Sequence, residues 1–536
     1  MARVSYLLAV GIACWLVLAG QSPGASGAKI MLAMTNVLYT VSQHILFSTI
    51  TEPLVERGHE VILVGPENKF TNGLTEGATT GKIFYKNSRT KEEMEGIISS
   101  LNAAVIGYSQ NSYREIYREA METIALDGEG CVKLFKDVDA LHRLKEEKFD
   151  LIITMPVDGC DALLAEYLDV PFIAMTPFRR ASTFSEDIFG IPVPSSYVPF
   201  NGFLTYTDRM TFKERVVNFV SRYVGDPLLR SIVFSRIRQI QREMGISPHL
   251  SLEQLLGKAQ LWLCQSHFAL EFAQPIAPNW VSIGGISVRP PKPLPQELED
   301  FVQGSGEHGI IVFTLGSVVR SLMDDVLTEK LAKVFSELPQ RVLWRYKGPI
   351  PRNLGNNTLI SDWLPQNDLL GHPKTRLLIY HGGANGIYEA TSHGVPVLLM
   401  PLAGDQMANA VRFKAKGIGF PIDKNTLTEE SFRQGLKEIL TNPKYTMNMK
   451  EASAIMRDEI VPTRKKIVYY VEHILKFGGD HLRSRALELN FIQLNSIDVI
   501  AFLLVVSLIF IYAAKWFISN CCCARCCRRC KKMKSD

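Results

Sequence analysis

The residues from Trp363 to Gln406 have the types and the spacing of a phosphate-binding site. An apolar strand is predicted over Leu377–Tyr380, and a glycine-rich turn and a short helix follow it. A strand that leads through glycines into a helix directs backbone N–H groups and the positive end of the helix dipole at one spot. Phosphate oxygens are the ligands that such a spot prefers, so the segment predicts nucleotide binding.

The parts of this segment follow one another without gaps. They are Trp-Leu-Pro-Gln at 363–366, a His-x-Gly that begins at His381, Glu389, Gly-Val-Pro at 394–396 and Gly-Asp-Gln at 404–406. In this order they resemble the donor-binding signature of the UDP-glycosyltransferase family, which includes the animal UDP-glucuronosyltransferases. The segments 283–316 and 343–347 and the C-terminal end are similar to that family too, so the resemblance covers nearly the whole chain. It is stronger in the second half than in the first.

The resemblance implies a role for each polar residue of the segment. Trp363 would stack on uracil, Gln366 would lie near the base and the ribose, and Glu389 would accept hydrogen bonds from the ribose hydroxyls. Two further groups of residues would hold the diphosphate and the sugar. They are Ser317, His381, Gly383, Asn385 and Gly386 for the diphosphate, and Asp405 and Gln406 for the sugar hydroxyls.

The co-substrate implied by this resemblance is UDP-glucuronate or UDP-glucose, and no other cofactor is expected. Cationic and dipolar groups that face the diphosphate stabilise it as it leaves, so no metal is required. Asp137 and Asp139 have the spacing of a metal-binding aspartate pair in other glycosyltransferases. They lie in a lysine-rich polar stretch over 133–148, which predicts a solvated helix face instead.

The catalytic base of the family is displaced in this chain. The family's histidine follows the first strand, and an alignment on residues 57–60 without a gap puts Gln43 there, with His44 one residue later. Adjacent residues of a helix point about 100° apart, so one of the two faces away unless the turn adjusts.

The family's partner aspartate is displaced as well. Its position falls on Met155, and Asp158 and Asp161 follow three and six residues later. We predict His44 as the general base and Asp158 as the residue that orients it. A site without an ordinary histidine–aspartate pair is the alternative.

Strand and helix predictions alternate along both halves of the chain, which indicates parallel sheets covered by helices. The resemblance implies the two-domain architecture called GT-B, with two doubly wound α/β domains. A proline-rich linker over 289–295 separates an acceptor-binding domain, 29–288, from a UDP-sugar-binding domain with a closing helix, 296–497. The predicted strands are at 30–34, 61–64, 151–154, 172–175, 310–314, 341–346, 377–380 and 396–400, and helices are predicted before Gly58, over 161–168 and after Pro462.

Both ends of the chain carry targeting signals. Residues 1–28 combine Arg3, an apolar run over Leu7–Leu18 and small residues at their end, which is the pattern of a secretory signal peptide. Residues 498–518 are predicted to form a transmembrane helix, long enough to cross a bilayer core of about 30 Å. Basic residues crowd the cysteine-rich tail over 519–536, so the positive-inside rule puts the tail in the cytosol and the preceding body in a lumen.

Lys532 and Lys534 resemble a dilysine retrieval signal, which predicts a single-pass type I protein of the endoplasmic reticulum membrane. Cys131, Cys160 and Cys264 are the lumenal cysteines, too few for a disulfide-dense scaffold. Asn356 begins the one usable glycosylation sequon. The sequence leaves open whether Asn356 is glycosylated and whether the protein forms a homo-oligomer.

Together these features predict an inverting UDP-glycosyltransferase that transfers glucuronic acid to small lipophilic acceptors. UDP-glucose is the alternative donor, because users of both sugars share the pair Asp405–Gln406. A nucleotide-sugar-binding homologue with impaired catalysis is the other alternative, motivated by Gln43 and Met155. The formal net charge of +5 over 536 residues is small, so no nucleic-acid partner is expected. The sequence does not identify the acceptor.

Overall fold

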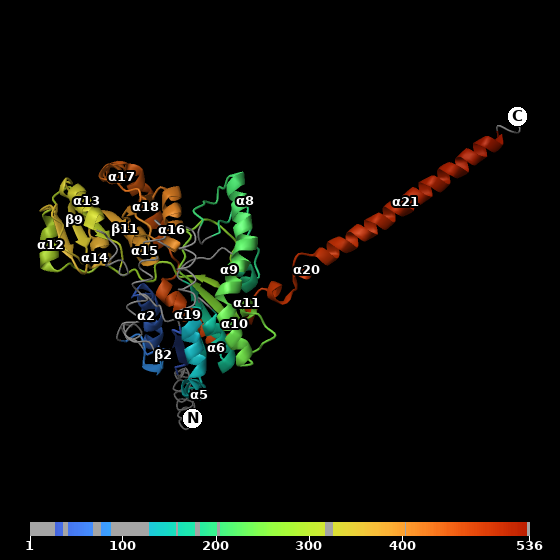
Figure 1. Ribbon diagram of the computed structural model, residues 1–536, viewed down its shortest axis with the longest axis horizontal. Coiled ribbons are helices and arrows are strands. Elements are labelled where there is room, and N and C mark those ends of the chain that lie inside the picture. The colour runs from blue at the N-terminus through green and yellow to red at the C-terminus, as the bar shows by residue number, and fades with distance from the viewer. Residues whose placement is uncertain are drawn as a thin grey trace, which may run out of the picture. The chain divides into compact units, whose positions relative to one another are not determined.

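The computed structural model describes residues 27–35, 41–67, 77–86, 128–156, 159–176, 183–200, 204–316, 325–402 and 404–532 (Figure 1). Asp158, Ser317, Lys534 and nearly all of the predicted signal peptide lie outside these residues. The chain divides into two compact units, Met1–Arg483 and Ser484–Asp536. The first unit holds two parallel sheets, and we call the body around each sheet the first lobe and the second lobe.

The first lobe is built on a seven-stranded sheet with the order β3-β2-β1-β4-β5-β6-β7. Each described pair of neighbouring strands is parallel. The strand order reverses between β1 and β4, which is where a doubly wound sheet opens a crevice at its carboxyl edge. The strands are β1 (Lys29–Ala33), β2 (Glu60–Pro66), β3 (Gly81–Tyr85), β4 (Leu151–Thr154), β5 (Phe172–Thr176), β6 (Leu261–Cys264) and β7 (Trp280–Ser282).

Both faces of this sheet are buried, because Ile30 and Leu32 belong to one apolar cluster and Met31 and Ala33 to another. Such strands read as continuous apolar runs, which is why β1, β2, β4 and β5 could be predicted from the sequence, whereas β3, β6 and β7 were not predicted. The helices of the first lobe are α2 (Val41–Glu56), α5 (Val138–Glu146), α6 (Cys160–Leu168), α7 (Thr183–Phe189), α8 (Phe212–Val220), the π-helix η2 (Ser221–Gly225), α9 (Asp226–Val233), α10 (Ser235–Glu243) and α11 (Leu252–Leu256).

The second lobe has a six-stranded sheet with the order β10-β9-β8-β11-β12-β13, again with parallel neighbours. Its strands are β8 (Ile310–Thr314), β9 (Arg341–Arg345), β10 (Thr358–Ser361), β11 (Thr375–Tyr380), β12 (Val397–Leu399) and β13 (Gly419–Pro421). Its helices are α12 (Gln296–Gln303), α13 (Asp325–Ser336), α14 (Gln366–Gly371), α15 (Ala384–His393), α16 (Asp405–Lys416), α17 (Glu429–Thr441) and α18 (Pro443–Arg457).

Helix α19 (Thr463–Phe477) follows the second lobe in sequence and packs on the first. Its Ile467, Val471 and Ile474 join the apolar cluster that contains Ile30 of β1. Arg464 of α19 also pairs with Glu52 of α2 at 3.1 Å. The helix expected after Pro462 is therefore present, and it closes the fold by returning the chain to the first sheet.

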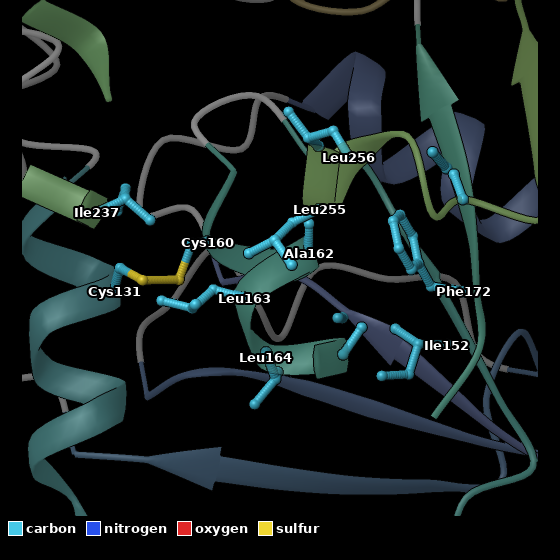
Figure 2. Packing of buried hydrophobic residues seen from close by; sticks show 14 of the residues in the cluster. Cys131, Ile152, Cys160, Ala162, Leu163, Leu164, Phe172, Ile237, Leu255 and Leu256 are labelled. Atoms are coloured by element: carbon cyan, nitrogen blue, oxygen red, sulfur yellow. A yellow bond between two sulfur atoms is a disulfide. The ribbon is translucent and has the colours of Figure 1, made fainter. Parts of the chain in front are cut away.

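A disulfide joins Cys131 to Cys160 inside the first lobe (Figure 2). It connects the helical residues 128–136 to the start of α6, among buried residues such as Leu163 and Ile237. Cys264 remains a buried thiol. The loop that the bond closes spans a sequence separation of 29, so the bond restricts the unfolded chain more than a short loop would.

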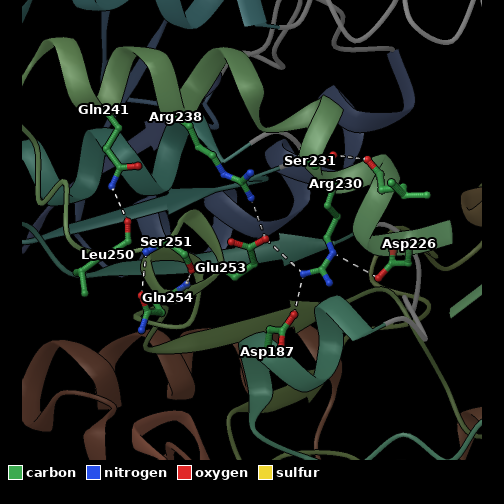
Figure 3. Close-up of polar contacts among 11 residues, drawn as sticks. Asp187, Asp226, Arg230, Ser231, Arg238, Gln241, Leu250, Ser251, Glu253 and Gln254 are labelled. Carbon is green, nitrogen blue, oxygen red and sulfur yellow. Dashed lines mark hydrogen bonds and ion pairs between the residues drawn. The ribbon is translucent and has the colours of Figure 1, made fainter. Parts of the chain in front are cut away.

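The helical excursion α8–α10 is fixed to the first lobe by a network of ion pairs (Figure 3). Arg230 of α9 lies 2.7 Å from Asp187 of α7 and 3.4 Å from Glu253 of α11. Arg238 of α10 lies 3.3 Å from Glu253. Because one carboxylate receives two guanidinium groups, the network ties α9 and α10 to the same point on α11.

The second unit contains the short helices η4 (Arg485–Glu488) and α20 (Phe491–Leu494) and the long helix α21 (Ile497–Lys532). Residues Ile497–Asn520 of α21 are long and apolar enough to cross a membrane, and no residue of their most apolar stretch is buried inside the protein. This one candidate span in the described part of the chain agrees with the helix predicted over 498–518.

The predicted fold class is confirmed. Two doubly wound parallel sheets carry helices on both faces, and strands β4 and β8 have the predicted limits. The linker at 289–295 stays a predicted boundary.

Candidate donor-binding and catalytic site

A cavity of about 370 Å³ lies at the carboxyl end of the second sheet, with Ile45 of α2 on its first-lobe side. Its wall contains most of the residues predicted to hold the uridine and part of the diphosphate site. These are Trp363, Gln366, Asn385, Gly386 and Glu389. Parallel α/β sheets bind ligands in this position, beyond the carboxyl ends of their strands.

The predicted phosphate cradle is the turn between β11 and α15. Helix α15 begins at Ala384, and its N-cap Gly383 makes no side-chain capping bond. The positive end of the helix dipole therefore faces the turn without a capping side chain, and the Gly386 N–H of the first turn donates to the Tyr380 hydroxyl. Gly382 has a φ of 92°, a conformation that favours glycine. A ligand anion is the natural partner of such an uncapped helix start.

His381 lies between two glycines of this cradle. A Cβ atom on Gly316 or on Gly383 would come within 2.6 Å of the imidazole ring, so both positions must stay small. Burial lowers the pKa of His381 to about 3, and the nearby Arg345 acts in the same direction. Its Nδ1 is buried without a hydrogen-bond partner among the described residues. His381 is thus a neutral group that can donate one N–H to a diphosphate oxygen.

Positive charge reaches the cavity from Arg345, which the sequence reasoning did not single out. It stands at the end of β9, and its guanidinium lies 4.5 Å from the ring centre of Trp363. The indole side chain keeps 59 % of its surface exposed, enough to accept a base. The sequence feature that could have identified Arg345 is its place as a charged residue directly after the apolar run of β9. Arg289 and Lys292 of the predicted linker also line the cavity.

Gln366 and Glu389 are brought together from two helices. The Nε2 group of Gln366, at the start of α14, donates to the Glu389 carboxylate on α15 at 2.5 Å. Burial raises the pKa of Glu389 to about 7, although the bond from Gln366 opposes this. The nearby Asp368 raises it further. Glu389 is thus poised to ionise when hydroxyl donors of a ribose arrive.

This pKa predicts how donor affinity depends on pH. If the ribose binds the ionised carboxylate, the affinity for UDP-glucose should fall as the pH drops through about 7, by about tenfold per unit below the pKa. UDP-glucose is the suitable titrant, because its esterified diphosphate does not titrate near neutral pH. Calorimetry across this range measures the effect, and Glu389→Gln should remove the step at about 7. A wild-type affinity that is level in pH would contradict the ribose role.

Asp405 and Gln406 begin α16 beside the cradle. Burial raises the pKa of Asp405 to about 6, and Arg412 and Asn409 counteract this. Asn409 donates to the Asp405 carboxylate at 2.9 Å and to the Gly382 carbonyl at 2.8 Å. Gln406 accepts from the Leu402 N–H at 2.8 Å. The predicted sugar-binding pair therefore lies next to the phosphate turn.

The predicted base, His44, is buried, unlike Ile45, the next residue on α2. The His44 side chain is only 5 % exposed, whereas Ile45 is 39 % exposed and lines the donor cavity. Gln43 donates to the sulfur of Met155 at 3.5 Å. The two residues that align with the family's catalytic pair thus contact each other, while His44 points about 100° away from each neighbour.

Asp158 and Asp161 are the two carboxylates that follow Met155 in the sequence. Asp161 is buried, and its two oxygens accept hydrogen bonds from the hydroxyls of Thr35 and Thr154. These contacts fix it between the ends of β1 and β4. Asp158, the predicted orienting residue, lies outside the described residues.

Asp137 and Asp139, whose spacing resembles a metal-binding pair, lie at the start of α5. The helix breaks at Asp137, whose carboxylate caps α5 by accepting from the Ala140 N–H at 3.0 Å. Asp139 is exposed on the first turn of α5. Among the described residues no three histidine, cysteine or acidic side chains gather as a metal site.

A GT-B fold with an uncapped helix start beside a tryptophan and a ribose-type carboxylate defines a nucleotide-sugar-dependent glycosyltransferase. Residues 33–536 match the family described as UDP-glucoronosyl and UDP-glucosyl transferase, and the chain belongs to this family. It is a UDP-glycosyltransferase, and its co-substrate is a UDP-sugar.

Curated relatives resemble the chain over most of its length. It is 35 % identical over 505 residues to UDP-glucuronosyltransferase 2A2 from Mus musculus, covering 92 % of this chain and 94 % of that protein. It is 35 % identical over 497 residues to UDP-glucuronosyltransferase 2B7 from Homo sapiens, covering 91 % and 92 %.

Solved structures share the fold at low identity. The calicheamicin glycosyltransferase CalG4 aligns with a TM-score of 0.56 at 16 % identity, covering 84 % of this chain and 99 % of that one. A UDP-glucosyltransferase from Polygonum tinctorium aligns with a TM-score of 0.58 at 13 % identity and the same coverage. These likenesses concern the architecture alone.

Proposed function

We propose that this enzyme transfers glucuronic acid from UDP-glucuronate to small lipophilic acceptors, with inversion at the anomeric carbon. The relatives named above are UDP-glucuronosyltransferases, which supports glucuronate as the sugar. The observation that carries the UDP part of the proposal is the cavity in which Trp363, Gln366 and Glu389 lie beside the uncapped start of α15.

The proposed reaction is a single displacement. A base removes the acceptor proton, the acceptor oxygen bonds to the anomeric carbon, and the bond from that carbon to the diphosphate breaks. UDP departs into the cradle of His381, Gly383, Asn385 and Gly386, with Ser317 as a further hydroxyl. Arg345 supplies a compensating charge in the cavity, so the proposal needs no metal. Asp405 and Gln406 hold the sugar hydroxyls.

Parallel assays test the donor. The full-length enzyme in membranes is given UDP-glucuronate or UDP-glucose with one broad phenolic acceptor, and UDP release is measured. We expect faster turnover with UDP-glucuronate. Faster turnover with UDP-glucose would show that UDP-glucose, and not UDP-glucuronate, is the preferred donor. UDP binding without turnover on any acceptor would favour the catalytically impaired homologue.

We propose His44 as the base and Asp158 as its orienting partner. The contact between Gln43 and Met155 supports a rearranged pair, because neither residue of the aligned positions can accept a proton at neutral pH. The alternative is a site without an ordinary histidine–aspartate pair, which would use acceptors that are nucleophilic without a base.

The proposed location is the endoplasmic reticulum membrane, with the body lumenal and residues 519–536 cytosolic. The apolar span Ile497–Asn520 supports the membrane anchor, and the buried disulfide Cys131–Cys160 supports an oxidising compartment. Asn356 is exposed, which suits a glycosylated residue.

Protease protection tests this topology. Protease added to sealed microsomes should remove only residues beyond about Ser519, because the bilayer shields the body. Immunoblotting with an N-terminal tag after the signal peptide measures the size change, and detergent is the control that should expose the whole chain. Digestion of the body without detergent would reverse the orientation. Replacing Lys532 and Lys534 with serine should release the protein from the endoplasmic reticulum if they form the retrieval signal.

A further inference from the structure

The segment Gln265–Glu271 leaves the first sheet at the end of β6 and enters the second lobe. Its Ala269 and Leu270 are buried in the apolar cluster that also contains Tyr388 of α15 and Phe413 of α16. The chain then returns to the first sheet as β7. The segment therefore belongs to the first lobe by sequence and to the core of the second lobe by packing.

One end of the segment contacts the predicted diphosphate site. Gln265 donates from Nε2 to the Asn385 Oδ1 at 2.7 Å, and its carbonyl accepts from the Tyr388 hydroxyl at 3.1 Å. Because the oxygen of the Asn385 amide is directed at Gln265, the NH₂ end of that amide is turned away from it. Asn385 lines the cavity, and a donor end suits an anionic ligand there.

The other end reaches the predicted sugar site through a relay. Glu271 accepts from Arg412 at 3.0 Å, with side chains 7 % and 8 % exposed. Arg412 also donates to the Asn409 Oδ1. Asn409 in turn donates to the Asp405 carboxylate and to the Gly382 carbonyl.

The relay has one workable orientation. A guanidinium carries donors only, so it fixes the oxygen of the Asn409 amide on its own side and the NH₂ group toward Asp405. The NH₂ group faces two acceptors, the Asp405 carboxylate and the Gly382 carbonyl, which favour the same orientation. Removing Arg412 takes away the donor that holds the amide oxygen, so the NH₂ group is held less firmly against the Asp405 carboxylate. A structural role alone would account for a buried ion pair, but it would not require the pair to end on two donor-site groups.

We propose that the Gln265–Glu271 segment is a positioning element for the donor, acting on Asn385 through Gln265 and on Asp405 through Arg412 and Asn409. This rests on the proposed roles of Asn385 and Asp405 toward the diphosphate and the sugar. Since the segment continues from β6, it couples the acceptor-binding lobe to both ends of the donor. Glu271, Arg412 and Gln265 are positioning residues, because they act through other side chains.

Crossed double-mutant cycles on the full-length enzyme test the relay. Arg412→Gln should raise the KM for the UDP-sugar by about 3- to 30-fold, the range for coupled contacting residues, and change inhibition by UDP less than twofold, because UDP has no sugar. In an Asp405→Asn background Arg412→Gln should add less than about twofold. Arg433→Gln is the matched control, because this arginine pairs with Glu337 on the surface at 2.8 Å.

The cycle for the other end has the opposite pattern. Gln265→Ala should weaken both UDP and UDP-sugar, keep its effect in the Asp405→Asn background, and lose it in an Asn385→Ala background. Thermal unfolding of each variant separates these effects from loss of structure. If Arg412→Gln does not fold, Glu271→Gln serves instead, since it removes one charge and keeps the shape.

Three outcomes decide the matter. Non-additive effects in both cycles support the proposal. Arg412→Gln effects that are as large with Asp405→Asn as without it would overturn the positioning role while leaving the proposed sugar site intact. Asp405→Asn and Asn385→Ala enzymes with wild-type KM and UDP inhibition would overturn the donor-site assignment itself, and the positioning role with it.

Discussion

Trp363→Ala should weaken UDP binding by about 1–3 kcal/mol, the scale of losing a stacked base. The indole is well placed for this role, because it is exposed at the cavity and carries the Arg345 guanidinium over its ring. Removing the ring deletes the platform for uracil and also removes the ring contact of Arg345, which keeps its bond to the Asp362 carbonyl. Calorimetry with UDP on the detergent-solubilised full chain measures the loss, and Trp363→Phe should recover part of it.

The other donor residues provide independent checks of the same site. Glu389→Ala should weaken UDP through the ribose, and His381→Ala through the diphosphate, because each removes one group of the assembled cradle. Phe477→Ala is the control, since it truncates an exposed aromatic residue on α19, away from the residues that line the cavity. The assignment fails if Trp363, Glu389 and His381 variants all bind UDP like the wild type.

Short apolar runs with clear ends allowed much of the fold to be predicted. Strands β4 and β8 are buried on both faces, so each is an apolar run that ends in a single buried threonine and has sharp limits. Strand β7 has three residues and is held by pairing with β6, which no local pattern reveals. The return of α19 to the first sheet depends on contacts with distant β1, and hydrophobic periodicity does not specify such a partner.

The disulfide shows a similar limit. Cys131, Cys160 and Cys264 allow several pairings, and sequence alone does not choose among them. Cys131 and Cys160 come together because α6, which follows β4, begins next to the helical residues 128–136.

Most residues of the proposed donor site could be named from the sequence because they lie in one continuous segment. Trp363, Gln366 and Glu389 come from the loops and helices that surround β11, so local sequence places them together. Arg345 and Gln265 come from β9 and from the end of β6, and only the tertiary structure brings them to the same site. The orientation of the Asn385 amide likewise depends on a partner from the other lobe.

His44→Ala should lower turnover on phenolic acceptors by about 10²–10⁴, the usual contribution of a positioned general base. UDP binding should stay nearly unchanged, because the proposed donor residues lie in the second lobe. A phenol must lose its proton to attack, whereas an amine is nucleophilic before it loses one. Amine acceptors should therefore suffer less from the substitution. Steady-state kinetics with a matched phenol and amine measure the difference.

The neighbours of His44 decide what the result means. Gln43→Ala should cost little if His44 is the base, and Asp158→Asn should lower turnover, because the imidazole loses its orienting carboxylate. His44 is buried, so the start of α2 must adjust for its imidazole to reach an acceptor. A His44→Ala enzyme that keeps full activity on phenols would exclude His44 as the base. The departure from the family at Gln43 and Met155 would then mean either that another group is the base or that the enzyme prefers acceptors that need no proton removed.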